Sequence, residues 1–175
     1  MNENIEQIKS KIRSVPDFPK KGILFRDITT ALQDAKTLKL TVDELYNNFK
    51  DIKIDYIAGI ESRGFIYGMP LAYKMNCGFI PVRKPNKLPA ETISVEYELE
   101  YGTDKIEIHK DALKKGDKVL IIDDLLATGG TAAAAVELIS KVAEPIGIAF
   151  VIELSELNGR QKLPKDLKVV SLVKY

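Results

Sequence analysis

Two spacings of apolar residues divide the chain into predicted helices and strands. Apolar residues at intervals of three and four predict amphipathic helices over residues 3–14 and 36–50. Short apolar runs predict buried strands over residues 56–60, 79–82, 118–123, 146–152 and 169–173, and helices over 65–75 and 130–143 follow two of them. The strand–helix–strand order predicts an α/β fold, with a core of mainly parallel strands flanked by helices on both faces.

Two regions depart from this alternation. Residues 93–100 and 105–109 alternate apolar and polar side chains around a Tyr-Gly-Thr-Asp turn at 101–104, which predicts a β-hairpin. Residues 15–22 contain two prolines and a glycine, and we expect them to be irregular.

The most informative segment follows the strand predicted at 118–123. Gly129 and Gly130 have no side chains, so their backbone can approach an anion closely. The helix that starts after them directs free N–H groups and the positive end of its dipole toward the same point. Thr128 and Thr131 can add hydroxyl donors, so the segment is typical of a phosphate-binding loop.

Two adjacent carboxylates, Asp123 and Asp124, precede this loop. These carboxylates would repel a bare anion. They therefore suit a partner with hydroxyl groups, such as a sugar diol, or one with positive charge, such as a hydrated metal ion or a cationic transition state. An ordinary strand–turn–helix with solvated acids at the strand end is the simpler alternative. The segment fits neither the P-loop, which requires Gly-Lys-Ser/Thr, nor the dinucleotide-binding fingerprint.

Composition narrows the class of protein. The 175 residues are enough for one domain, and 45% of them are hydrophobic. The 26 Lys and Arg residues nearly balance the 25 Asp and Glu residues, so no basic field favours nucleic-acid binding. The single Cys77 excludes an intrachain disulfide, and no apolar run is long enough to span a bilayer. We therefore expect a cytoplasmic protein that binds neither nucleic acid nor membrane.

Three polar segments lie where predicted strands end: residues 61–64, 83–87 and 123–131. In open parallel sheets ligands bind at the carboxyl ends of the strands. We therefore expect these segments to meet at one site. Taken alone, 61–64 could be a surface turn with an exposed Arg63, and the basic residues of 83–87 could be a solvated face.

Several motifs resemble the type I phosphoribosyltransferase family, and within it the adenine phosphoribosyltransferases. They extend over nearly the whole chain, in the order of the family, at residues 18–29, 59–65, 83–89, 99–102, 119–131 and 157–160. The resemblance implies that adenine and 5-phosphoribosyl pyrophosphate (PRPP) react to give AMP and pyrophosphate, with Mg²⁺ held mainly by PRPP and water. It also implies a homodimer, and a small hood built largely from residues 1–34 on the single domain 1–175.

The resemblance assigns roles to these segments. The ribose and 5′-phosphate of PRPP are bound by Asp123, Asp124, Ala127, Thr128, Gly129, Gly130 and Thr131. Pyrophosphate is bound by Glu61, Ser62, Arg63 and Gly64, in a loop with a non-proline cis peptide, and by Arg83, Lys84 and Lys87. One basic residue of 83–87 is expected to reach the site of the neighbouring subunit.

The resemblance assigns adenine binding to Leu24, Phe25 and Arg26. Phe25 would stack on the purine, and backbone groups of Leu24 and Arg26 would read its edge. A backbone carbonyl favours an exocyclic amine over a 6-oxo group. Without the resemblance, Phe25 would more readily be interpreted as a core residue.

Glu100 and Tyr101 are the candidate catalytic residues, within a hairpin over residues 88–109 that we expect to act as a mobile lid. The transition state resembles an oxocarbenium ion, and a carboxylic acid with a raised pKa can protonate the purine ring. A closed lid would exclude water. His109, the single histidine, is expected to be structural.

Two other functions are compatible with parts of the pattern. One is a phosphoribosyltransferase for another purine or for xanthine, which the residues around Phe25 and 99–102 disfavour. The other is a transcription regulator that senses PRPP or purines. The chain lacks the additional length and net positive charge that such a regulator would use to bind DNA.

Overall fold

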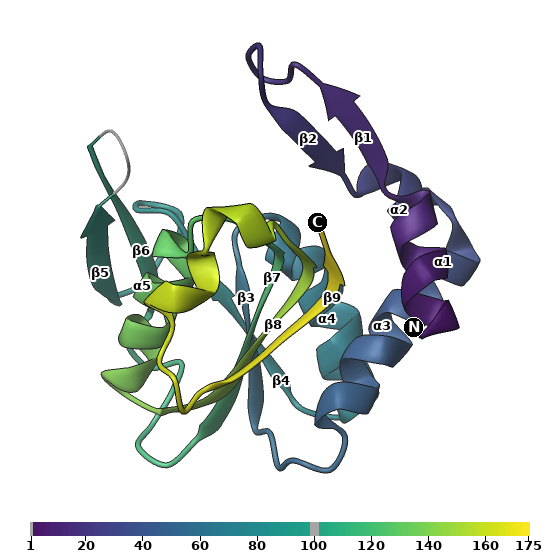
Figure 1. Ribbon diagram of the computed structural model, residues 1–175. Helices are drawn as coiled ribbons and strands as arrows, with labels where there is room; N and C mark the ends of the chain where they lie inside the picture. The colour runs from purple at the N-terminus through teal and green to yellow at the C-terminus, as the bar shows by residue number, and fades with distance from the viewer. Residues whose placement is uncertain (1, 99–101) are drawn as a thin grey trace.

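A five-stranded parallel sheet forms the centre of the computed structural model, which describes residues 2–98 and 102–175 (Figure 1). Its strands lie in the order β4-β3-β7-β8-β9. Their bounds are β3 Tyr56–Ile60, β4 Gly78–Val82, β7 Lys118–Leu126, β8 Glu144–Glu153 and β9 Lys168–Lys174. All five were predicted from apolar runs, and the parallel α/β fold is confirmed.

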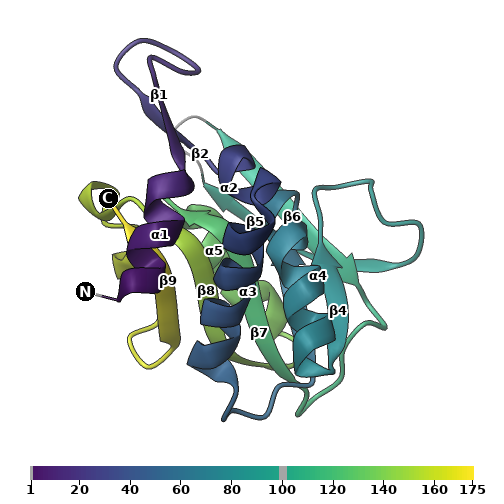
Figure 2. The same ribbon diagram turned by 90° about the vertical axis from the view of Figure 1, so that its right-hand side faces the viewer.

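Helices cover one face of the sheet, and a helix with a hairpin covers the other (Figures 1 and 2). On the first face, α1 (Glu3–Lys11), α3 (Ala35–Phe49) and α4 (Arg63–Met75) enclose a core that includes Leu45 and Phe49. On the second face, α5 (Gly130–Ser140) and the antiparallel pair β5 (Thr92–Glu98) and β6 (Thr103–His109) enclose a core around Ile121 and Phe150. Both the helices and the hairpin follow the predicted pattern.

The amino-terminal region differs from the prediction. Residues 15–22 are not irregular throughout, because β1 (Arg13–Pro16) pairs antiparallel with β2 (Leu24–Asp27). Pro16 lies opposite Leu24 at the end of the ladder, where its missing N–H costs least. Short helices that were not predicted also occur: α2 (Thr29–Gln33), η1 (Ser155–Leu157) and η2 (Gly159–Lys162). The β1–β2 hairpin projects away from the central sheet (Figure 1).

Helix boundaries follow local capping. The helix predicted to start at residue 36 begins at Ala35, where the side chain of Asp34 accepts a hydrogen bond from the N–H of Thr37 at 2.8 Å. Helix α4 ends at Asn76, which adopts a left-handed conformation with φ of 55°. The first and last long helices are each three residues shorter than predicted, ending at Lys11 and Ser140.

The order of the strands brings the three polar segments together. Strands β4, β3 and β7 are neighbours, and residues 83–87, 61–64 and 123–131 follow or complete their carboxyl ends. From β3 the chain moves to β4 on one side, whereas β7 lies on the other side and leads to β8. The topological switch point therefore lies between β3 and β7, the position where open α/β sheets bind ligands.

Candidate functional site

The loop between β7 and α5 is packed backbone against backbone. Gly129 adopts φ of 80°, and a Cβ atom there would lie 2.2 Å from the carbonyl oxygen of Gly159. In the other direction, a Cβ atom on Gly159 would lie 2.1 Å from the carbonyl oxygen of Ala127. Neither position can accept a side chain without moving backbone. The shape of the anion loop is thus set by glycines from two distant segments.

The segment 157–160 has a structural function that sequence reasoning missed. Arg160 donates to both carboxylate oxygens of Glu153, at 3.1 and 2.6 Å, and to the carbonyl oxygen of Val169 at 3.0 Å. These bonds fix η2 against β8 and β9 and hold Gly159 under the loop. The family resemblance included this motif without a role, and only the spatial contact supplies one.

The acidic pair lies at the end of β7, beside the start of α4. Asp124 is only 4% exposed, and the Nε atom of Arg63 is 2.7 Å from its Oδ2 atom. The backbone N–H of Asp124 donates to Oδ1 of Asp123 at 2.8 Å. Burial and the neighbouring Asp124 charge raise the pKa of Asp123 well above its ordinary value. Burial also raises the pKa of Asp124, although Arg63 opposes this shift.

A glycine allows the two segments to approach. A Cβ atom on Gly64 would lie 2.6 Å from the carbonyl oxygen of Ile122, so α4 can start directly against β7. The peptide bond between Glu61 and Ser62 is cis, as the family resemblance implied. Arg63 therefore lies beside the acidic pair, although 60 positions separate them in the chain.

Glu61 organises the basic segment after β4. Its carboxylate accepts from Nε of Arg83 at 3.1 Å and from the backbone N–H of Lys84 at 3.0 Å, and it lies 3.2 Å from Nζ of Lys87. The Arg83 guanidinium, with these other donors, lowers the pKa of Glu61 to about 2. Its carboxylate thus holds cations in place. The ammonium of Lys84 pairs separately with Asp104.

The candidate adenine residues lie on β2. Phe25 is half-buried, and the ring of Phe18 meets it edge-on at a centroid distance of 5.1 Å. The guanidinium carbon of Arg63 is 5.8 Å from the centre of the Phe25 ring. Phe25 belongs to neither core cluster. The projecting hairpin therefore reaches back to the loop of residues 61–64, and the two candidate subsites are adjacent.

Side chains from opposite ends of the chain hold β2 in position. The guanidinium carbon of Arg26 is 3.7 Å from the centre of the Tyr175 ring, and its Nη1 atom donates to Oγ of Ser14 at 2.5 Å. Leu24 is largely exposed. In a two-stranded ladder, every second residue of β2 turns its N–H and C=O away from β1. Such groups can read the edge of a base.

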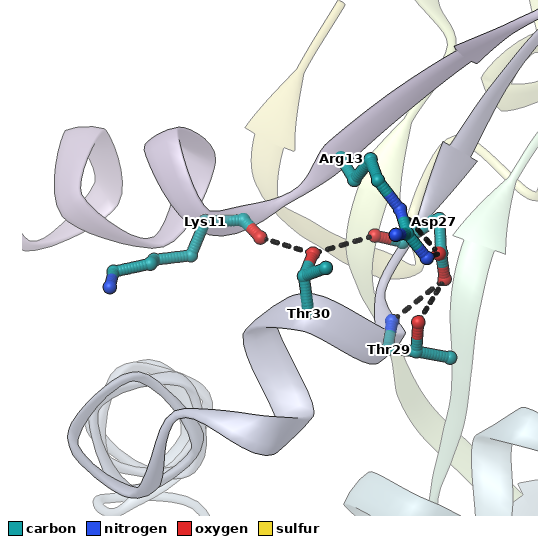
Figure 3. A network of polar contacts seen from close by, with 5 residues as sticks. All are labelled: Lys11, Arg13, Asp27, Thr29 and Thr30. Carbon is teal, nitrogen blue, oxygen red and sulfur yellow. Dashed lines mark hydrogen bonds and ion pairs between the residues drawn. The ribbon is translucent and has the colours of Figure 1, made fainter.

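Asp27 joins β2 to α2 (Figure 3). Its Oδ1 atom accepts from the N–H and hydroxyl of Thr29, at 2.9 and 2.7 Å, and its Oδ2 atom accepts from Arg13 at 2.5 Å. The hydroxyl of Thr30 donates to the carbonyl oxygen of Lys11 at 2.6 Å. The Thr29 hydroxyl, followed by Arg13, lowers the pKa of Asp27 to about 2.

The candidate catalytic residues Glu100 and Tyr101 lie outside the described residues. The strands on either side are described, and Glu98 pairs with Thr103 at the end of the β5–β6 ladder. His109 is half-buried on β6, opposite Thr92 at the other end of the hairpin. Across residues 2–98 and 102–175, no helix combines the length and the apolar character needed to cross a membrane.

Comparisons with known proteins agree with this geometry. The family model "Phosphoribosyl transferase domain" matches residues 29–174. Adenine phosphoribosyltransferase of Trichodesmium erythraeum is 58% identical over 170 residues, which cover 97% of this chain and 99% of that protein. The same enzyme of a Cyanothece species is 60% identical over 169 residues, covering 96% and 99%.

Solved structures give the same result. The adenine phosphoribosyltransferase of Thermoanaerobacter pseudethanolicus has a TM-score of 0.94 and 52% identity, with 98% of this chain and 99% of that chain covered. The enzyme of Saccharomyces cerevisiae, in complex with adenine and an imino-altritol bisphosphate, has a TM-score of 0.92 and 41% identity, with 98% and 99% covered.

Proposed function

This chain belongs to the adenine phosphoribosyltransferases of the phosphoribosyltransferase family, and on that premise we propose how its residues divide the reaction. The enzyme transfers the 5-phosphoribosyl group from PRPP to adenine, giving AMP and pyrophosphate. The observation that supports this assignment of residues to substrate groups is the position of Arg63. This guanidinium lies between the acidic pair at the end of β7 and the Phe25 ring on β2.

The β7–α5 loop takes the sugar phosphate. Backbone N–H groups of Ala127 to Thr131 and the start of α5 bind the 5′-phosphate. Asp123 and Asp124 accept hydrogen bonds from the ribose hydroxyls and stabilise the positive charge that develops on the ribose ring. Support for this role comes from their burial at the switch point, where carboxylates are costly unless a ligand or partner uses them.

Arg63 and basic residues of the segment 83–87 bind the pyrophosphate group. A guanidinium presents a planar fork of donors that suits phosphate oxygens. Arg63 is paired with Asp124, and Arg83 and Lys87 are paired with Glu61. Glu61 contributes by ordering these cations, while Ser62 and Gly64 shape the loop that presents Arg63. Pyrophosphate then adds a second anionic partner to guanidinium and ammonium groups that are already positioned.

Adenine binds on β2, between the hairpin and the pyrophosphate loop. Phe25 stacks on the purine, and backbone groups of Leu24 and Arg26 pair with its edge. The half-buried position of Phe25 outside both cores supports this role. Together, residues 1–34 act as the hood of a single domain.

Glu100 transfers a proton to the purine ring, and Tyr101 helps to close the site, as parts of a lid formed by residues 88–109. If Glu100 is the proton donor, Glu100→Gln lowers the turnover number by roughly 10²-fold while PRPP still binds. Unchanged turnover in a single-turnover assay would remove Glu100 from the mechanism.

Mg²⁺ suits the donor set of this site. Asp123 and Asp124 offer hard carboxylate oxygens beside an anion loop, which match the preference of Mg²⁺ for a few carboxylates plus substrate oxygens and water. Because Arg63 already contacts Oδ2 of Asp124, most ligands would come from PRPP and water. When bound, the ion would neutralise charge on the pyrophosphate group.

A second copy of the chain completes the assembly that we propose. Ile66, Met69 and Tyr73 follow one face of α4 and are 42%, 52% and 90% exposed. This apolar stripe begins one turn after Arg63, so a homodimer formed through it would place the partner near the pyrophosphate loop. Met69→Glu with Tyr73→Glu should shift the sedimentation coefficient from dimer to monomer; a wild-type monomer would contradict the proposal.

The cytoplasm is the compartment we propose, because PRPP and AMP are multiply charged and do not cross bilayers freely. The function is tested by AMP formation from adenine, PRPP and Mg²⁺, with hypoxanthine, guanine and xanthine in parallel. We expect turnover with adenine alone. Turnover with another base would overturn the role of β2 in specificity, and tight PRPP binding without turnover would favour a sensor.

A further inference from the structure

Four side chains from four segments meet beside the anion loop; we name Lys84, Tyr97, Asp104 and Thr131 the Tyr97 node. The hydroxyl of Tyr97 on β5 lies 3.1 Å from Oδ2 of Asp104 on β6, and 3.1 Å from Oγ1 of Thr131 at the start of α5. The ammonium of Lys84, after β4, pairs with the same Asp104 oxygen. The node therefore links the β7–α5 loop to the basic segment through the turn end of the β5–β6 hairpin.

The protons of the node can be placed by counting donors. Asp104 acts as an acceptor, because its carboxylate pairs with the Lys84 ammonium and accepts from the backbone N–H of Lys105 at 2.8 Å. Burial opposes the shift, but these donors lower the pKa of its carboxyl. Tyr97 has one proton, which it donates to this carboxylate. The contact between Tyr97 and Thr131 then requires Thr131 to be the donor. The Thr131 hydroxyl proton is therefore directed toward Tyr97.

A phosphate group at the loop changes this arrangement. A phosphate oxygen accepts and cannot donate when it is ionised, so Thr131 must turn its proton away from Tyr97 to bind it. The two oxygens would then repel unless Tyr97 rotates its own proton toward Thr131. Asp104 tolerates this loss because the Lys84 ammonium still pairs with it.

We propose that Tyr97 is a positioning residue, whose hydroxyl switches from Asp104 to Thr131 when a 5′-phosphate binds. This inference rests on the proposed function, in which Thr131 contacts that phosphate. A hydroxyl that accepts one hydrogen bond becomes a better donor in the next, so Tyr97 strengthens the bond from Thr131 to the ligand. The same switch leaves Asp104 with the Lys84 ammonium and the backbone N–H of Lys105, and phosphate occupancy thereby alters the electrostatic partner of the basic segment.

The test is a double-mutant cycle on ligand binding. Tyr97→Phe removes only the hydroxyl, and Thr131→Val removes the hydroxyl it supports while keeping a β-branched side chain. The ligands are ribose 5-phosphate and AMP, titrated by calorimetry into each single variant and the double variant. Ser140→Ala is the matched control, because it removes another hydroxyl hydrogen bond of α5, to the carbonyl oxygen of Val136 at 2.7 Å, at the far end of the helix from Thr131.

We expect Tyr97→Phe to weaken both ligands about fivefold in the wild-type background, the effect of one ordinary hydrogen bond. In the Thr131→Val background the same change should alter affinity less than twofold, and Ser140→Ala should have no effect. Equal weakening in both backgrounds would assign Tyr97 a purely structural role and overturn the proposal. No weakening in the wild-type background would overturn it as well.

Steady-state kinetics separate this result from the function itself. Tyr97→Phe should raise the KM for PRPP and leave the KM for adenine unchanged. If the wild-type enzyme forms no AMP, the proposed function fails. If it forms AMP and the cycle shows no coupling, only the Tyr97 switch fails.

Discussion

The two halves of the site are held in place by different kinds of contact. The β7–α5 loop sits at the end of a buried strand, and its Gly129 touches the backbone of Gly159 at a distance that excludes any side chain. The β1–β2 hairpin stands outside the sheet and is held by side chains: Asp27 with Arg13 and Thr29, and Arg26 with Tyr175. The β7–α5 loop is thus shaped by backbone packing, whereas the β1–β2 hairpin is held by polar and stacking contacts at an edge.

This difference in how the two regions are held suits the ligands that we propose for them, a phosphate group at the β7–α5 loop and adenine at the β1–β2 hairpin. A phosphate group is recognised by many fixed N–H groups, whose geometry depends on backbone that does not move. A base inserted between two segments needs one of them to approach and withdraw, and elements with few buried apolar contacts open at low cost. The two regions should therefore respond differently to substitution.

The largest effect is expected from glycine substitutions in the two regions. Gly129→Ala combines a positive φ with a Cβ atom 2.2 Å from the carbonyl oxygen of Gly159. We expect more than about 3 kcal/mol of lost stability and roughly a 100-fold fall in kcat/KM for PRPP, since backbone must shift. Urea unfolding and AMP formation are the measurements.

Gly22→Ala in the hairpin is the matched control. Gly22 also has a positive φ, of 90°, but a Cβ atom there would have no neighbour within 4 Å among the described residues. Only conformational strain of about 1–2 kcal/mol is expected, with near-normal activity. Similar losses for both variants would contradict the idea that backbone packing shapes the anion loop.

The next largest effect is expected at the acidic pair, where one substitution should raise stability and lower activity. The pKa of Asp123 is raised, so the folded protein holds this proton more tightly than the unfolded chain. The contribution of this group to the free energy of unfolding is fully present at low pH. It decreases as the pH rises above 3.8, the ordinary pKa of an Asp carboxyl. Asp123→Asn should therefore raise the melting temperature at pH 8 while it lowers kcat by roughly 10²-fold.

Calorimetry at pH 8 and pH 4 checks this prediction. The gain in melting temperature should be largest at pH 8 and small at pH 4, where the native carboxyl is already protonated. A lower melting temperature at pH 8 would mean that the carboxylate is stabilised by partners in the folded state.

The contribution of Asp27, in the hairpin, to stability should depend on pH in the opposite direction from that of Asp123. The pKa of Asp27 is lowered to about 2, so its contribution is present above 3.8 and lost as the pH falls through 2. Asp27→Asn should lower the melting temperature at pH 7, by roughly 2–4 °C for each kcal/mol lost, and raise the KM for adenine severalfold. An unchanged KM for adenine would separate this network from base binding.

The smallest effect is expected at Tyr175. Tyr175→Leu removes the ring beneath Arg26, an interaction worth about 0.5–2 kcal/mol, and should raise the KM for adenine two- to fivefold with little change for PRPP. Tyr175→Phe keeps the ring and should restore the wild-type value. A rise in KM for Phe as large as that for Leu would assign the effect to the hydroxyl.

Periodic elements could be predicted from the sequence, because apolar spacing reports burial directly. All five strands of the sheet, both faces and the β5–β6 hairpin followed from it. Strands β1 and β2 did not, since a short ladder with Pro16 and few buried residues leaves little pattern. The parallel topology then placed the three polar segments at neighbouring strand ends.

Long-range contacts could not be predicted in this way. Nothing local indicates that Gly159 supports Gly129, that Arg63 lies near Phe25, or that Tyr97 reaches Thr131. The motif at 157–160 was visible, but its role appears only when the fold brings it under the loop. The proposals for Glu100 and Tyr101 rest on the family resemblance.

The most direct test of the divided site is hydrogen exchange with two ligands that differ only in the base. Ribose 5-phosphate and AMP both carry the 5′-phosphate, and only AMP carries adenine. We expect both ligands to protect amides of residues 127–131 and AMP alone to protect those of residues 24–26. Protection of residues 24–26 by ribose 5-phosphate, or no protection there by AMP, would contradict the assignment of the base to the hairpin.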